Sequence, residues 1–397
     1  MYPNQNVSMI GKKYKKFITL KKIIENSNQQ PGYGYPPPQQ MPMAQIGMPL
    51  QMHQQQFPMG FMQQPMSYQQ MPGQMNMRMA QQFFVKKTRP TVKPVENFDA
   101  SADAAILRKA MKGIGTDEKA LISVICCRPN YQLIEIAKAF KTSYGKDLID
   151  NVKSETSNNF QKVLIALIKP RWEFICEELQ KGDAEALYEI MCTLTNEEIR
   201  QIKNVFQMKY KSDLESTLKK STSGYMKRLM ISLSSGGRDE SMHTDIEKAR
   251  TDALALKKAG VDRLGTDEAE FIRVLCLRNF EQLKLVCQEY EKLRGKSLEK
   301  DIKSEFSGDI QDSLLAIVRY ANNQSAFFAK CLYKSMKGIG TNDSRLIRVC
   351  VLRAEIDMMD IKDEFLKIEG KTLKSFIEGD TSGDYRRALL TLCGELY

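Results

Sequence analysis

Hydrophobic residues in the C-terminal three quarters of the chain recur with the spacing of an α-helix. After about Glu96, no stretch alternates with the period of two that a half-buried strand would show. Two segments place their apolar residues at i, i+3, i+4 and i+7, with charges on the other faces. These are Leu133, Ile136, Ala137 and Phe140, and then Phe160, Val163, Leu164 and Leu167. The pattern predicts an all-α fold of short helices.

Local signals mark where some of these helices begin and end. Thr195-Asn-Glu-Glu198 has the form of a capping box, in which the first and last side chains satisfy free backbone N–H groups. Gly145 is typical of a helix stop, and Pro170 separates one group of helices from the next.

The helical part also repeats itself. The segment Met111–Thr116, Met-Lys-Gly-Ile-Gly-Thr, recurs letter for letter at Met336–Thr341, and a looser copy lies at Gly260–Thr266. An arginine, a glycine and an acid follow the last glycine of each copy by 13, 30 and 40 residues. They are Arg128, Gly145 and Glu155, then Arg278, Gly295 and Glu305, then Arg353, Gly370 and Asp380. The spacing predicts stacked helical units of about 70 residues each.

A fourth copy lies between the first and the third. Two positions align it with the others: Leu148, Leu214, Leu298 and Leu373, and Ser157, Ser223, Ser307 and Ser382. In this second unit Ser221 stands where the others have an acid, and Gln180-Lys-Gly-Asp183 replaces a loop about six residues longer. We predict that the second unit keeps its helices and has lost the site.

The first 95 residues have a different composition. Residues 29–82 contain sixteen Gln, eleven Met and nine Pro, and no acid occurs from Asn26 to Val95. Such a segment cannot bury a core, so we expect a disordered tail. It is either a flexible linker or a self-associating sequence. At its start, Ile10–Ile24 mixes apolar residues with six lysines, which fits an interfacial helix on anionic lipid or a disordered basic tip.

Charge and composition exclude several classes of function. The 397 residues carry a net charge of +11, of which residues 1–95 hold +10, from eleven Lys/Arg and one acid. The helical part is therefore nearly neutral, and nucleic acid is not expected as a partner. Nine cysteines without a CxxC pair favour reduced thiols in the cytoplasm, and two histidines leave little room for histidine catalysis. We expect neither a transmembrane helix nor a signal peptide.

These motifs resemble one family. From about residue 97 to the end, the chain is similar to the core of the annexins, whose calcium signature is a Lys-Gly-x-Gly-Thr loop with an acid 40 residues on. The resemblance implies four five-helix repeats in a curved disc, with calcium loops on the convex face. We accordingly expect a tail at 1–95, calcium-binding repeats at 97–169, 247–325 and 326–397, and a degenerate repeat without a calcium site at 170–242.

The loop chemistry suits Ca²⁺, which takes six to eight oxygen ligands. Glycine-rich turns can direct several backbone carbonyls to one point, and Glu155, Glu305 or Asp380 supplies the charge. By resemblance, the carbonyl donors are Met111, Gly113 and Gly115, then Gly260, Arg263 and Gly265, then Met336, Gly338 and Gly340. The third loop is one residue longer, so Val261 remains an alternative to Gly260. With one carboxylate per ion we expect a dissociation constant of roughly 10⁻⁴ M.

A weaker second ion is also possible in each loop. Its ligands would be a threonine and an acid two residues later: Thr116 with Glu118, Thr266 with Glu268, and Thr341 with Asp343. The alternative is that each acid only stabilises the first turn of the next helix through the helix dipole.

The leading functional hypothesis is calcium-dependent binding to anionic phospholipid of the phosphatidylserine type, with calcium bridging loop and headgroup. Ile114, Leu264 and Ile339 would touch the membrane, or else pack within the protein, while Lys112, Arg263 and Lys337 would meet headgroups. No nucleophile–base pair, P-loop or dinucleotide motif is present, so we expect no enzyme. The predicted location is the cytoplasm, with recruitment to plasma or vesicle membranes when calcium rises. The alternative is a calcium-independent helical scaffold that its basic tail recruits to membrane, RNA or protein.

Overall fold

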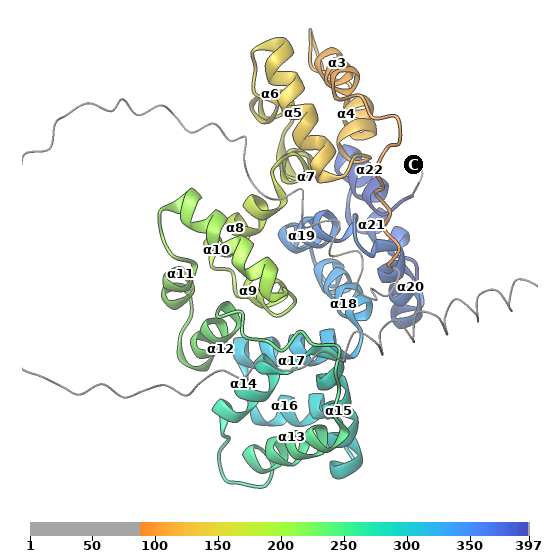
Figure 1. Ribbon diagram of the computed structural model, residues 1–397. Coiled ribbons are helices and arrows are strands. Elements are labelled where there is room, and N and C mark those ends of the chain that lie inside the picture. The colour runs from red at the N-terminus through yellow and green to blue at the C-terminus, as the bar shows by residue number, and fades with distance from the viewer. Residues whose placement is uncertain (1–87, 396–397) are drawn as a thin grey trace, which may run out of the picture. The chain divides into compact units, whose positions relative to one another are not determined.

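The computed structural model describes residues 88–395, which form an assembly of helices (Figure 1). Residues 1–87 of the predicted tail, including the basic segment Ile10–Ile24, lie outside the described residues, whereas residues 88–95 are described. Within 88–395 there are twenty helices and no strand, as the periodicity predicts. They fall into four groups of five, which we call repeats 1 to 4.

Repeats 1 and 2 follow each other directly. Repeat 1 contains α3 (Ala100–Ala110), α4 (Glu118–Ile125), α5 (Asn130–Tyr144), α6 (Leu148–Glu155) and α7 (Asn158–Ile168). Repeat 2 contains α8 (Arg171–Lys181), α9 (Ala184–Met191), α10 (Asn196–Tyr210), α11 (Leu214–Ser221) and α12 (Gly224–Ser234).

Repeats 3 and 4 have the same order of helices. Repeat 3 contains α13 (Ile246–Ala259), α14 (Glu268–Leu277), α15 (Phe280–Arg294), α16 (Leu298–Glu305) and α17 (Gly308–Asn322). Repeat 4 contains α18 (Gln324–Met336), α19 (Asp343–Arg353), α20 (Met358–Glu369), α21 (Leu373–Asp380) and α22 (Gly383–Leu392).

The positions that the sequence aligns have equivalent places in the helices. The four leucines begin α6, α11, α16 and α21, and the four serines are N-cap residues of the helices that follow. Gly145 ends α5 with a φ of 65°, in the left-handed region where glycine carries no Cβ penalty. In repeat 2 the equivalent residue is Lys211, with a φ of 52°. The capping box at Thr195 is also present, with both hydrogen bonds formed.

One hydrophobic core runs through all four repeats. Five residues before each left-handed helix end stands a fully buried aromatic side chain, and the four are Phe140, Phe206, Tyr290 and Phe365. Between repeats, α22 packs on α4 and α7, while α17 packs on α9 and α12 (Figure 1). Repeat 1 is thus joined to repeat 4, and repeat 2 to repeat 3.

The segment before repeat 1 is attached to repeat 4. The N–H groups of Thr91 and Val92 both donate to the carbonyl of Ala354, at 2.9 and 3.0 Å. The Arg89 side chain pairs with Asp360 at 2.8 Å, and Val92 is buried. Residues 89–92 therefore belong structurally to the helical assembly, and the expectation of a disordered tail up to residue 95 is wrong for them, because their backbone and side chains bond repeat 4.

Candidate metal sites

Three loops join the first and second helices of repeats 1, 3 and 4, and all their glycines except Gly260, with a φ of −108°, have strongly positive φ angles. Gly113 and Gly338 have φ angles of 113° and 105°, where residues with a Cβ are rarely found. Gly115 and Gly340 have φ angles of 85° and 82°, so the two identical segments adopt the same conformation. In the third loop, Gly265 has a φ of 78°.

Each loop is closed by the same backbone hydrogen bond. The N–H of Asp117 donates to Ala110 at 3.0 Å, and the N–H of Asn342 donates to Ser335 at 2.7 Å. In the third loop, the N–H of Asp267 donates to Ala259 at 2.7 Å. Each loop therefore opens with the residue after the accepting carbonyl: Met111, Gly260 or Met336. The additional residue of the third loop lies after Gly260.

A distant carboxylate is held beside every one of these loops by a threonine. The Thr116 hydroxyl donates to the Glu155 carbonyl oxygen at 3.1 Å and lies 3.3 Å from its Oε2. The other two threonine hydroxyls donate to a carboxylate oxygen at 2.9 Å, Thr266 to Glu305 and Thr341 to Asp380. A Cβ built on Gly260 would lie 3.5 Å from Cγ of Glu305. The 40-residue spacing thus corresponds to a real contact between loop and acid.

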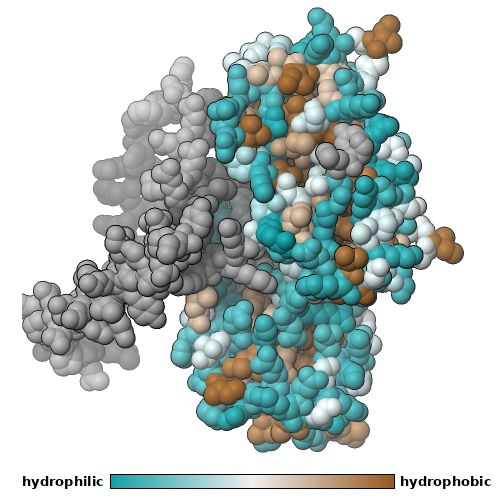
Figure 2. Space-filling model, turned by 90° about the vertical axis from the view of Figure 1, so that its right-hand side faces the viewer, coloured by the Kyte–Doolittle hydropathy of each residue, from teal (hydrophilic) through white to brown (hydrophobic). Residues whose placement is uncertain are grey.

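The loops combine a buried anchor with a fully exposed tip. Met111 and Met336, which open two of the loops, are only 4% and 3% exposed. Ile114, Leu264 and Ile339 at the tips are 109%, 102% and 109% exposed, so the alternative that they pack within the protein is wrong. Figure 2 shows hydrophobic side chains that project singly from the right-hand edge.

The basic residues at the loop tips make few close contacts with the rest of the protein. Lys112 is exposed, and Arg263 Nη1 lies 3.6 Å from Asp267 Oδ2. The Lys337 ammonium lies 5.4 Å from the centroid of the Tyr333 ring. Their side chains are therefore free to contact a partner in solution.

The two members of each predicted secondary set make different contacts. The threonines bond the main acid, while Glu118, Glu268 and Asp343 each begin the next helix. Asp343 also accepts a hydrogen bond of 2.8 Å from the Tyr385 hydroxyl. Burial and that hydrogen bond raise the pKa of Tyr385. The three acids thus lie in the first turn of a helix, and the second ion stays a prediction.

Repeat 2 lacks this architecture at the same place. Only Gly182 and Asp183 separate α8 from α9, against residues 111–117 in repeat 1. A Cβ built on Gly182 would lie 3.0 Å from the Cβ of Ser221, so the short turn packs directly against the residue that replaces the acid.

The donor chemistry fits a hard cation. Within residues 88–395 no group of three or more His, Cys, Asp or Glu side chains could hold a metal ion. The predicted donors are backbone carbonyls and a single carboxylate in each loop, an all-oxygen set that suits Ca²⁺ and not zinc or copper.

The recurring arginines have a structural role. Arg128 Nε pairs with Asp103 at 2.8 Å, and Arg278 Nε pairs with Asp252 at 2.6 Å, both between the second and first helices of a repeat. In repeat 4, Phe328 occupies the aspartate position. Arg353 stacks there at 4.2 Å from the ring centroid and pairs with Asp357 at 2.7 Å.

The vicinal cysteines are not activated. Cys126 is buried, and burial raises the pKa of its thiol well above the ordinary value. Burial also raises the pKa of the Cys127 thiol, despite the opposing charge of Arg128. Neither thiol is poised as a thiolate nucleophile.

Sequence reasoning missed a buried ionic network between repeats 2 and 4. On α19, Arg345 pairs with Glu189 at 2.5 Å, and Arg348 pairs with Glu189 and Glu178 at 2.6 and 2.9 Å. All four side chains are at most 4% exposed. The sequence feature that could have indicated this network is the pair of arginines, three residues apart, within the apolar sequence of α19.

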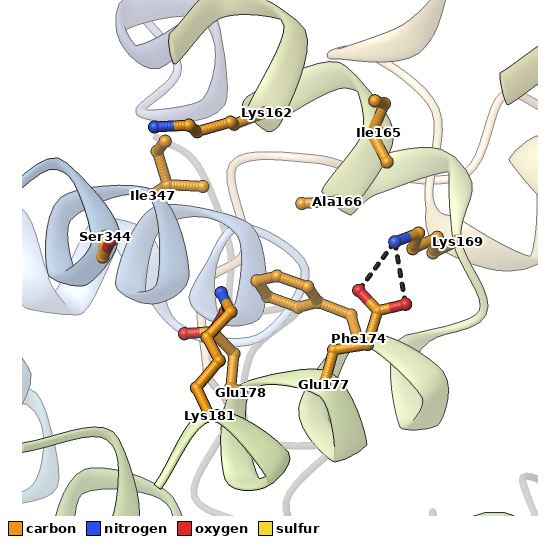
Figure 3. A pocket seen from close by; sticks show the side chains of 10 residues that line it. All are labelled: Lys162, Ile165, Ala166, Lys169, Phe174, Glu177, Glu178, Lys181, Ser344 and Ile347. Carbon is orange, nitrogen blue, oxygen red and sulfur yellow. Dashed lines mark hydrogen bonds and ion pairs between the residues drawn. The ribbon is translucent and has the colours of Figure 1, made fainter. Parts of the chain in front are cut away.

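A small pocket of about 170 Å³ lies beside this network, between α7, α8 and α19 (Figure 3). The figure shows Lys169 Nζ directed at both carboxylate oxygens of Glu177, at 2.8 and 2.6 Å. Lys181 likewise pairs with Glu178. With Lys162, three lysines and two glutamates line the pocket, so its lining carries a net charge of +1.

Comparison with known proteins agrees with this geometry. The family model described as Annexin matches four times, at residues 102–167, 177–233, 251–317 and 327–392. Annexin A4 of Canis lupus familiaris is 49% identical over 310 residues, which cover 77% of this chain and 97% of the relative.

Solved structures agree as well. The structure of annexin III has a TM-score of 0.75 at 42% identity, covering 77% of this chain and 97% of that one. Calcium-bound annexin (Sm)1 has a TM-score of 0.70 at 36% identity, covering 78% and 94%. With four repeats matched and a relative aligned over nearly its whole length, this chain belongs to the annexin family.

Proposed function

We propose that this protein binds calcium at the loops of repeats 1, 3 and 4 and thereby attaches to anionic phospholipid membranes. The observation that supports this most is the same local arrangement found three times. A turn with at least one positive-φ glycine lies beside one carboxylate, which a threonine hydroxyl holds in place. Annexin (Sm)1, at 36% identity, has been solved with calcium bound.

The proposed ligands are three carbonyl oxygens and one carboxylate in each loop. Met111, Gly113 and Gly115 act with Glu155 in repeat 1, Gly260, Arg263 and Gly265 with Glu305 in repeat 3, and Met336, Gly338 and Gly340 with Asp380 in repeat 4. Gly260 is preferred to Val261 because the closing hydrogen bond aligns it with Met111 and Met336. The threonine–acid sets are proposed as weaker second sites, with a role of each acid at the start of its helix as the alternative.

When bound, calcium would supply positive charge and vacant coordination positions. A phosphoryl oxygen of a lipid headgroup can fill one of those positions. The protein's own residues then make the remaining membrane contacts. The exposed tips Ile114, Leu264 and Ile339 enter the interface, and nearby cations favour an anionic surface by roughly 1 kcal/mol each. Among residues 88–395 no helix is long and apolar enough to cross a membrane, which is consistent with a peripheral mode.

The resulting protein is a binding module and not an enzyme, recruited from the cytoplasm to plasma or vesicle membranes when calcium rises. The +10 tail is proposed to promote self-association or vesicle clustering, and not calcium binding. A variant without residues 1–87 should keep calcium-dependent binding but cluster vesicles less, as vesicle turbidity would measure. Equal clustering by the shortened protein would reduce the tail to a linker.

Co-sedimentation with phosphatidylserine vesicles tests the main proposal. The variant without residues 1–87 should pellet with vesicles in calcium and return to the supernatant when a chelator is added. Removal stops at residue 87 because Arg89 and Val92 contact repeat 4. Pelleting that persists undiminished in chelator would instead favour the calcium-independent scaffold.

A further inference from the structure

Repeat 2 has a pocket where the other repeats have their candidate metal sites. It has a volume of about 390 Å³ and lies beside the short turn at Gly182 and the ring of Tyr210. Every side chain that lines it is neutral or basic, and none is a carboxylate. The remaining lining residues are Gln180, Lys181, Ser212, Thr217, Lys220 and Ser221.

The charge at this place is reversed relative to the other three repeats. The last two residues of α6, α16 and α21 are Ser-Glu, Ser-Glu and Gly-Asp, each with a charge of −1. The last two residues of α11 are Lys220 and Ser221, with a charge of +1. Repeat 2 has therefore lost an acid and gained a base at adjacent positions.

Helix geometry explains why a positive charge is favoured here. Helices α8 and α11 end at Lys181 and Ser221, and the contact of Gly182 with Ser221 brings these two C-termini together. Helix C-termini carry partial negative charge and stabilise a nearby cation. In repeats 1, 3 and 4 the equivalent place is the proposed calcium site. In repeat 2 no carboxylate lines that place, and Lys181 and Lys220 line the pocket beside it.

The lysines differ in how far they are neutralised. Lys219 pairs with Glu215 at 2.6 Å. Lys181 pairs with Glu178, but that carboxylate also pairs with Arg348, so Lys181 is only partly neutralised. Lys220 is exposed and forms no ion pair among the described residues. Beside it, the Ser212 hydroxyl can donate a hydrogen bond, whereas the Thr217 and Ser221 hydroxyls already donate to backbone carbonyls at 3.5 and 3.0 Å. An ammonium with a neighbouring hydroxyl donor is suited to phosphate oxygens.

We propose that this pocket of repeat 2 binds the phosphate of an anionic lipid headgroup without calcium, using Lys220 and Lys181 as built-in cations. The inference rests on the proposed function, because it takes the membrane as the surface that the equivalent loops meet. It makes repeat 2 a fourth contact with the bilayer, one that is sensitive to salt and insensitive to chelators.

The test compares charge-matched variants of the full chain. In Lys181→Gln/Lys220→Gln the pocket loses both cations. In the control, Lys284→Gln/Lys371→Gln, the chain loses the same charge at two exposed lysines that form no ion pair among the described residues. Binding to vesicles of phosphatidylserine and phosphatidylcholine is measured by flotation in chelator at low ionic strength. The tail is present in every variant, so its contribution cancels.

The pocket variant should bind about five- to 25-fold more weakly than wild type, since each basic residue near an anionic surface contributes roughly fivefold. The control should lose clearly less, and Lys220→Arg should retain binding. Equal losses in both pairs would mean that only net charge matters and would overturn the proposal, as would an unchanged pocket variant. All variants should melt alike in chelator.

A second arm separates lipid from free phosphate. Titration with inorganic phosphate and with a soluble short-chain phosphatidylserine should show that the pocket lysines strengthen binding of the lipid. Loss of inorganic phosphate binding with vesicle binding intact would overturn the lipid assignment. The proposed calcium function is judged separately, by the calcium response of the wild type, because the pocket variant retains Glu155, Glu305 and Asp380.

Discussion

Repeats 1 and 2 have the same five helices but different turns between the first two. In repeat 1, residues 111–117 form an open loop beside Glu155, whereas in repeat 2 only Gly182 and Asp183 connect the helices. The buried aromatic side chain is nevertheless the same, Phe140 in one repeat and Phe206 in the other. The turn can therefore shrink without loss of the packing that forms the core.

This comparison shows that fold and site are separable in this protein. The helices are stabilised by buried apolar surface, which depends on positions such as Leu148 and Leu214 at the starts of α6 and α11. The candidate site depends on backbone conformation and one exposed or half-buried acid at the helix ends. Changes at the site should alter calcium response far more than stability.

The largest expected effect comes from removing all three acids. In Glu155→Gln/Glu305→Gln/Asp380→Asn, each proposed ion loses its formal protein charge, while the shape of each side chain is kept. The calcium concentration for half-maximal vesicle binding should rise by more than about tenfold, a loss of over roughly 1.4 kcal/mol. Single variants should shift less, because the other loops hold the protein at the membrane. Calcium titration of co-sedimentation measures both.

Stability provides the control for this variant. Melting in chelator should change little, since the three acids are not in the core, while stabilisation by added calcium should shrink. If the triple variant bound vesicles at the wild-type calcium midpoint, the assignment of these acids would be wrong.

The next largest effect concerns the exposed tips. In Ile114→Ser/Leu264→Ser/Ile339→Ser, vesicle affinity at saturating calcium should fall by about three- to tenfold, a modest part of the roughly 1.5–3 kcal/mol for burying each such side chain fully. Calcium binding without lipid should be unchanged. The matched control is Ile106→Ser/Leu254→Ser/Leu366→Ser, where the side chains are 44%, 41% and 48% exposed on helices. Equal losses in control and variant would argue against tip insertion.

Glycine substitutions should separate the two kinds of turn. Gly338→Ala adds a methyl group in open space but at a φ of 105°, so it should distort the loop and raise the calcium midpoint by about threefold. Gly182→Ala would bring its Cβ within 3.0 Å of Ser221, so it should lower the free energy of unfolding by about 1–2 kcal/mol. Thermal melting and calcium titration of both variants check that Gly338→Ala changes mainly the calcium midpoint and Gly182→Ala mainly the stability. A shift in calcium midpoint for Gly182→Ala would contradict it.

Periodicity and repeat spacing predicted the all-α class, and the aligned leucines and serines stand at equivalent helix starts. The 40-residue spacing predicted which acid meets each loop. The threonine hydroxyls that hold these acids could not be assigned from sequence, because a threonine in a turn has several possible partners. The buried pairing of Arg345 and Arg348 with Glu189 joins residues over 150 positions apart, and no local pattern contains that information.

The smallest effect is expected when an acid alone is restored in repeat 2, which tests whether the carboxylate is sufficient for a calcium site. Ser221→Glu restores an acid at the position of Glu155, and calcium binding followed by calorimetry should show no additional ion. The carboxylate alone would not make a site, because Gly182 and Asp183 do not provide the three carbonyl oxygens of the longer loops, and Lys220 beside it would compete for the charge. Wild-type stoichiometry is therefore expected, with Ser221→Ala as the control. An extra ion in Ser221→Glu would show that the acid, and not the loop, limits calcium binding in repeat 2.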